Sequence, residues 1–189
     1  MKHRQIATTA LVATLGTALV LLTGCSKSGA GDSARTLAIG GTATVKANAD
    51  NKQQVAVSVT VTGIEAGTSA DLRELENSSQ YSGKTPYYLR YRIAATQSGD
   101  SDVLEDFVAY AGAEQLTQLD VMPSLDVTGD PNNPLTSHGF SKCEPADTAK
   151  LKNAAAGQSL DGCVIYLADG GVGAPTKVQW GTPPTIWKP

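Results

Sequence analysis

Residues 55–62 constrain the fold of this chain more than any other segment. Valine occupies every second position from 55 to 61, and the positions between hold Ala56, Ser58, Thr60 and Thr62. Successive side chains of an extended chain point to opposite faces, so this pattern creates one apolar and one polar face. A helix would scatter the valines around its circumference. The pattern therefore predicts a β-strand whose apolar face must be covered by a second layer of structure.

Residues 86–95 alternate in the same way. One face carries Tyr87, Leu89, Tyr91 and Ile93, and the other carries Tyr88, Arg90 and Arg92. We expect the first set to face the core. The second set is the candidate recognition stripe, because tyrosine and arginine are enriched at binding interfaces. The competing interpretation is that the two arginines pair with acidic residues across the sheet.

The remaining segments predict short elements separated by turns. Residues 103–110 and 115–121 are expected to form a hairpin around Gly112, and further strands are expected at 163–167, 177–180 and 185–187. One or two helical turns are expected at 68–77, behind a Ser69 cap, and a short capped helix is expected at 147–156, before Gly157. Residues 126–140 are expected to form a loop. About seven or eight short strands without long alternating helices indicate an all-β antiparallel sandwich. We expect Trp180 and Trp187 to fill its core rather than to form a carbohydrate-binding surface.

The amino terminus has the pattern of a secretory signal. Lys2 and Arg4 precede an uncharged, Ala- and Leu-rich stretch over residues 6–22. A transmembrane anchor is the alternative, but the stretch is short for a membrane span and contains several threonines. The sequence Leu22-Thr23-Gly24-Cys25 resembles the bacterial lipobox. That resemblance implies cleavage before Cys25 and attachment of a diacylglycerol to its thiol, and two acyl chains suffice for stable anchoring.

These features divide the chain into three parts. We expect a lipoprotein signal peptide at 1–24, the lipidated Cys25 with a flexible tether at 25–39, and one β-sandwich domain at 40–189. Loss of Lys2 and Arg4 with the signal leaves 13 basic against 18 acidic residues, a formal charge of −5. This acidic balance argues against nucleic acid as a partner. The expected location is the extracellular face of the cell membrane, with no cofactor.

Two cysteines remain in the exported domain, Cys143 and Cys163. In an oxidising compartment we expect them to form a disulfide. A metal site is the first alternative, although His138 is the only soft ligand nearby. A redox pair is the second, although such pairs are usually close together in sequence.

The order of the motifs resembles a family of bacterial surface domains with an immunoglobulin-like, telokin-like fold and no assigned activity. The matching pieces run from residue 40 to residue 187: the valine strand followed by Gly63-Ile64-Glu65, the segment 83–90, the hairpin at 110–116, Cys143, the segment 157–167, and Pro184-Thr185-Ile186-Trp187. The resemblance implies an immunoglobulin-like extracellular domain. It carries no catalytic residues to this chain.

The sequence offers no assembled catalytic set. His138 follows Ser137 directly, and neighbours in sequence do not form a nucleophile–base pair. The acidic pairs Asp100/Asp102, Glu105/Asp106 and Asp126/Asp130 match no metal-binding motif. We therefore expect a non-catalytic binding or interaction module for an extracellular protein or cell-wall ligand. The alternatives are a secreted hydrolase or inhibitor with a carboxylate or loop site, and a structural envelope protein.

Overall fold

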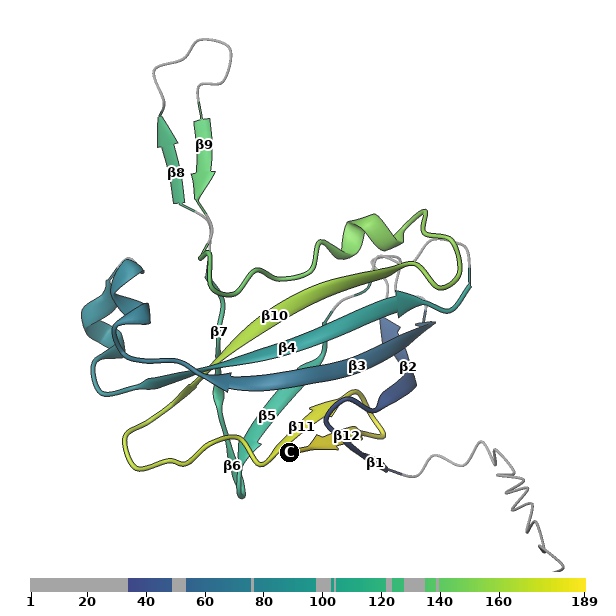
Figure 1. Cartoon of the computed structure of the whole chain (residues 1–189), viewed down its shortest axis with the longest axis horizontal. Coiled ribbons are helices and arrows are strands. Elements are labelled where there is room, and N and C mark those ends of the chain that lie inside the picture. The colour runs from purple at the N-terminus through teal and green to yellow at the C-terminus, as the bar shows by residue number, and fades with distance from the viewer. Residues whose placement is uncertain are drawn as a thin grey trace, which may run out of the picture. The chain divides into compact units, whose positions relative to one another are not determined.

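Two five-stranded sheets enclose one apolar core in the computed structural model (Figure 1). The structure describes residues 34–48, 54–75, 77–97, 103, 105–121, 124–127, 135–138 and 140–189. The first sheet has the order β2 (Thr42–Asn48), β3 (Gln54–Ala66), β4 (Thr85–Ala95), β10 (Ser159–Ala168) and β7 (Thr117–Leu119). The second has the order β1 (Arg35–Ala38), β12 (Thr185–Lys188), β11 (Lys177–Trp180), β5 (Phe107–Ala111) and β6 (Glu114–Gln115).

The remaining described elements are short. Strands β8 (Ser124–Val127) and β9 (Leu135–His138) pair with each other, and three 3₁₀ turns occur at η1 (Asp71–Glu74), η2 (Ser78–Tyr81) and η3 (Thr148–Leu151). Among the described strand pairs, β1 with β12 is parallel and the others are antiparallel. The predicted all-β, immunoglobulin-like antiparallel sandwich is confirmed. Within the described part of the chain, no helix has the length and apolarity to cross a bilayer.

The valine strand behaves as its alternation predicts. Val57, Val59 and Val61 are fully buried in β3. The register shifts after Val61, where a β-bulge leaves Thr62 without a paired residue and sets Ile64 opposite Leu89. The extra residue keeps the apolar side of the strand on the core and places Glu65 opposite Tyr88 on the outer face. The bulge therefore brings a carboxylate to the face that carries the arginines.

Both tryptophans lie in the core, as predicted. Trp187 on β12 donates its indole N–H to the Gly41 carbonyl at 2.8 Å. Trp180 on β11 packs edge-on against Phe107, with ring centroids 4.5 Å apart, and its indole N–H reaches the Lys46 carbonyl at 3.4 Å. Because Gly41 and Lys46 flank or belong to β2, each tryptophan links the second sheet to the first.

The predicted boundary between tether and domain was wrong. Strand β1, Arg35–Ala38, lies inside the stretch expected to be a flexible tether, and it pairs with β12. Leu37 and Ile39 pack against the core, which supplies the apolar burial that a flexible linker lacks. The folded domain therefore begins before residue 40. Cys25 and the signal sequence lie outside the described residues.

Three further predictions are corrected by the structure. The expected loop at 126–140 contains parts of β8 and β9, because residues 124–127 and 135–138 pair in antiparallel register, a contact that local composition does not report. The predicted second hairpin arm is divided, since β6 pairs with β5 whereas β7 pairs with β10 in the other sheet. The short helix expected at 147–156 is only one 3₁₀ turn, η3; the helical turn expected at 68–77 is present as η1, but η1 begins after Ala70 without a side-chain cap from Ser69. Buried Leu116 stands between β6 and β7, where the chain changes sheets.

Candidate functional site

Part of the outer face of the first sheet is covered by a second apolar cluster. Tyr88, Ile165 and Leu167 project from β4 and β10, and they pack with Leu72, Phe140 and Cys143 from connecting segments. Tyr88 is therefore only 4% exposed, and the prediction that it belongs to an exposed stripe was wrong. Alternation assigned Tyr88 to the correct face of the strand. It did not reveal that Leu72 of η1, Phe140 and Cys143 lie over that face.

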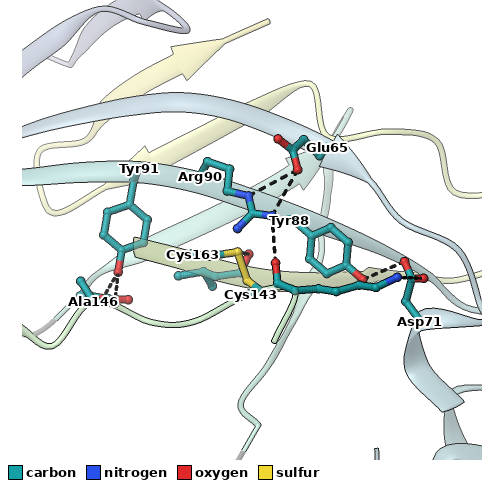
Figure 2. Close-up of a disulfide and its surroundings, with 11 residues drawn as sticks. Glu65, Asp71, Tyr88, Arg90, Tyr91, Cys143, Ala146 and Cys163 are labelled. Atoms are coloured by element: carbon teal, nitrogen blue, oxygen red, sulfur yellow. Dashed lines mark hydrogen bonds and ion pairs between the residues drawn. A yellow bond between two sulfur atoms is a disulfide. The ribbon is translucent and has the colours of Figure 1, made fainter. Parts of the chain in front are cut away.

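Residues 140–146 form a segment that we call the strap. Cys143 on the strap is bonded to Cys163 on β10, with their Cα atoms 5.1 Å apart (Figure 2). This confirms the predicted disulfide. The two cysteines lie on the outer side of the first sheet rather than between the two sheets, since Cys163 is opposite outward-facing Arg90. The bond therefore fixes a connecting segment to a late strand.

Asp71, the first residue of η1, binds the strap through the side chain of Lys142. Its carboxylate accepts hydrogen bonds from the Lys142 ammonium at 2.5 Å, the Thr68 backbone N–H at 2.9 Å and the Tyr88 hydroxyl at 3.0 Å. The Lys142 contact is the main reason why the pKa of Asp71 lies well below its usual value. Burial, followed by the bond to Asp71, raises the pKa of Tyr88. Figure 2 shows the Tyr88 hydroxyl directed at Asp71. No sequence motif indicated that these three donors would meet at Asp71.

Arg90 joins the strap to β3. Its guanidinium donates to Glu65 at 3.3 and 3.4 Å and to the Lys142 carbonyl at 2.8 Å (Figure 2). It also lies 5.9 Å from the centroid of the Tyr88 ring. Arg90 therefore positions the strap as well as lining the surface beside it.

Arg92 makes the second ion pair of the predicted stripe. It donates to both carboxylate oxygens of Asp161, at 2.7 and 3.0 Å, across the β4–β10 register. The hydrogen bond from Arg92 lowers the pKa of Asp161. The two side chains are 54% and 68% exposed, so the pair stays open to solvent. Both arginines thus satisfy the competing interpretation of cross-strand pairing, and both still line a surface.

That surface is a groove of about 530 Å³ beside the strap. We call it the arginine groove. Most of its lining side chains are polar or charged: Thr62, Glu65, Arg90, Tyr91, Arg92, Ser141, Glu144 and Asp161, with Gly162 and Cys163 completing it. Guanidinium donors, carboxylate acceptors and hydroxyls lie within one hollow. Such a lining suits a polar ligand that exchanges hydrogen bonds with the protein.

Tyr91 reaches the strap by crossing β10 above a glycine. Gly162 is its register partner, and the Tyr91 hydroxyl and ring end occupy the space of the missing Cβ. The hydroxyl donates to Glu105 and accepts a hydrogen bond from the Ala146 N–H at 3.2 Å. Figure 2 shows Tyr91 directed at Ala146. Burial raises the pKa of Glu105, against the opposing effect of the Tyr91 and Ala146 hydrogen bonds.

Gly162→Ala is expected to lower the free energy of unfolding by about 1–3 kcal/mol, as overpacking does in a filled core. A Cβ at this position would approach the Ala146 Cβ to 2.8 Å and the Tyr91 ring still more closely. Gly63→Ala is the matched control, because its Cβ would meet nothing within 4 Å. Urea denaturation of the two variants tests the expectation. Equal stability of both variants would contradict the close packing of Tyr91 on Gly162.

The acidic pairs considered in the sequence are only partly described. Glu105 and Asp106 follow Val103, while Asp100, Asp102 and Asp130 lie outside the described residues. Asp126 lies on β8, and Ser137 and His138 lie on β9. Within the described ranges, no group of three or more His, Cys, Asp and Glu side chains is arranged to hold a metal ion. The carboxylate-site alternative stays a prediction.

Comparison with known proteins gives one structural likeness and no family. No family model matches the chain, and no curated protein matches it. A solved structure, the 1.5 Å crystal structure of the secreted protein MPT63 from Mycobacterium tuberculosis, is similar to 84% of this chain and 100% of its own, with 14% identity and a TM-score of 0.48. A likeness of this extent transfers no function to the present chain.

Proposed function

We propose that this chain is an exported, lipid-anchored, non-catalytic binding module that recognises an extracellular protein or cell-wall ligand through the arginine groove. The observation that carries the proposal is the groove itself, in which two paired guanidiniums and several hydroxyls line one polar hollow of about 530 Å³. The anchor rests on Leu22-Thr23-Gly24-Cys25. Residues 1–24 would be removed, and the lipid on Cys25 would hold the domain at the extracellular face of the membrane.

Arg92 is the side chain best suited to contact such a ligand. It is exposed, and its partner Asp161 is exposed as well. Exposed ion pairs contribute at most about 1 kcal/mol, so a ligand carboxylate can replace Asp161 at little cost. Arg90 is less free, because it also holds the Lys142 carbonyl of the strap. We therefore assign recognition mainly to Arg92 and positioning mainly to Arg90.

Reversing the charges of the Arg92–Asp161 ion pair distinguishes an effect on ligand recognition from an effect on the stability of the fold. Arg92→Asp is expected to reduce capture of the partner about tenfold, a loss of about 1.4 kcal/mol, which is what a contributing interface residue typically costs when it is removed. The double variant Arg92→Asp, Asp161→Arg re-forms the ion pair in reverse and is expected to leave capture low while restoring stability. Capture is measured on intact cells with a photo-crosslinking amino acid at Ser141, inside the groove, and at Glu114, exposed on β6. Lys188→Asp, an equal charge change on exposed Lys188, is the control.

Two outcomes would contradict the proposal. Unchanged capture by Arg92→Asp, or equal crosslinking from Ser141 and Glu114, would discard the arginine groove as the binding surface. The anchor is tested separately by replacing Cys25 with serine, which is expected to release the protein into the medium without an acyl group. Native protein that begins at Met1 and carries no acyl mass on residue 25 would discard the anchor.

A further inference from the structure

A second, smaller hollow lies along the strap, and it differs in character from the arginine groove. It has a volume of about 220 Å³, and we call it the strap pocket. Its apolar lining includes Leu119 at the end of β7, Val121 two residues further on, Phe140 on the strap, and Ile165 on β10. Pockets for drug-sized ligands usually measure about 300–1,000 Å³, so this one suits a single side chain. The two hollows share Cys163 and Glu144, hence the strap borders both.

The charged groups of the strap pocket all have the same sign. Glu105, Asp120 and Glu144 line it from three separate segments, and the described lining contains no lysine or arginine. The arginine groove, in contrast, carries both signs. An apolar wall bordered by carboxylates complements a side chain with an aliphatic stem and a cationic end.

We propose that the strap pocket binds one lysine side chain of an extracellular peptide or protein, with the aliphatic stem on the apolar lining and the ammonium among Glu105, Asp120 and Glu144. Lysine fits better than arginine. An ammonium offers three N–H donors, which match three separate carboxylates, whereas a guanidinium is a planar fork suited to one carboxylate held bidentately. The site is distinct from the arginine groove and does not require that groove to bind anything.

Glu105 makes the binding depend on pH. Burial raises its pKa, and the ionisable groups that act on it are Tyr91 on β4 and Asp120 after β7. Burial, followed by the charge of Glu105, in turn raises the pKa of the neighbouring Tyr166 on β10. A bound ammonium favours the carboxylate form and so lowers that pKa. By linkage, affinity for lysine falls as the pH falls through the range in which Glu105 takes up its proton.

The test uses three blocked tripeptides, acetyl-Ala-Xaa-Ala-amide with lysine, arginine or norleucine in the middle. Each is titrated into the complete folded domain, and backbone amide signals are followed by NMR. We expect the lysine peptide to shift the amide signals of residues 119–121, Cys143 and Glu144 and to bind more tightly than the other two. Since one partly exposed ion pair contributes modestly, Asp120→Asn is expected to weaken lysine binding about threefold and Glu105→Gln with Asp120→Asn about tenfold.

The controls distinguish the pocket from general charge. Glu114→Gln removes one exposed acid elsewhere, and Lys188→Asp adds an exposed acid on β12; both should keep the lysine affinity. Asp120 is exposed and accepts a hydrogen bond from Gln118, so its replacement should leave the fold intact even if Glu105→Gln does not. Equal or tighter binding of norleucine or arginine, equal weakening by Glu114→Gln, or no shifts at these residues would each overturn the proposal.

Discussion

Replacing Trp187 with alanine is expected to lower the free energy of unfolding by about 3–5 kcal/mol, the range found when a large buried aromatic is truncated. The side chain has no exposed surface and lies where β12 faces the first sheet. Its loss would open a cavity between the sheets and would leave the Gly41 carbonyl without the indole donor. Urea or thermal denaturation measures the change, and the domain is expected to unfold at a clearly lower temperature.

Two further variants on β12 show how much of the lost stability comes from the indole hydrogen bond and how much from the position of Trp187 in the core. Trp187→Phe keeps much of the ring volume but removes the indole N–H, so it should lose less than the alanine variant. Ile186 lies on the opposite face of β12 and is only half-buried, so Ile186→Ala should be milder. If Trp187→Ala were no worse than Ile186→Ala, the assignment of Trp187 to the centre of the core would be wrong.

Replacing both Cys143 and Cys163 with serine is expected to lower the free energy of unfolding by about 3 kcal/mol, as the chain-entropy treatment gives for a loop of this length. The two cysteines are 20 residues apart. Part of this lost stability comes from the outer apolar cluster, because a released strap would no longer cover Tyr88 and Ile165. Denaturation gives the total change, and increased binding of an apolar dye under native conditions would report the uncovered cluster.

The matched control replaces a cysteine that the disulfide does not use. Cys25→Ser in the purified polypeptide makes the same substitution at a cysteine outside the described residues, and the stability of this variant is expected to equal that of the parent. Reduction of the parent with a thiol should reproduce the instability of the double variant. Free thiols at both Cys143 and Cys163 in unreduced protein, detected by mass spectrometry, would refute the bond.

The disulfide prediction also bears on the arginine groove. Arg90 donates to the Lys142 carbonyl, one residue before Cys143. A released strap would withdraw that acceptor together with Ser141 and Glu144, which line the groove. The double serine variant is therefore expected to lose partner capture as well as stability, whereas Trp187→Ala should affect capture only through the fraction of folded protein.

The alternating segments were predictable because strand geometry is local. Val57, Val59 and Val61 are buried where the period of two placed them, and the same holds for Leu89, Tyr91 and Ile93. The bulge at Thr62 was not predicted, since a one-residue register shift depends on how β3 pairs with β4. Strand β1 was missed for the same reason, because only pairing with β12 makes residues 35–38 a strand.

The candidate site was predicted in part. Arg90 and Arg92 were identified by alternation, and both line the arginine groove. Tyr88 was assigned to the same exposed stripe, but Leu72 and Phe140 cover it. Glu65, Asp161 and Glu144 carried no sequence signal, because they come from three distant segments that only the fold brings beside the arginines.

The sequence by itself determined the period-two faces, the burial of both tryptophans and the availability of one cysteine pair for a disulfide. These features depend on residue type and on neighbours a few positions away. The tertiary structure alone decided what covers each face: the strap over Tyr88, the ring of Tyr91 above Gly162, and the separation of a mixed-charge groove from an acidic pocket. A sheet face is covered by segments that lie far from it in the sequence. The local residue pattern of a strand therefore cannot indicate which segment will pack on that face.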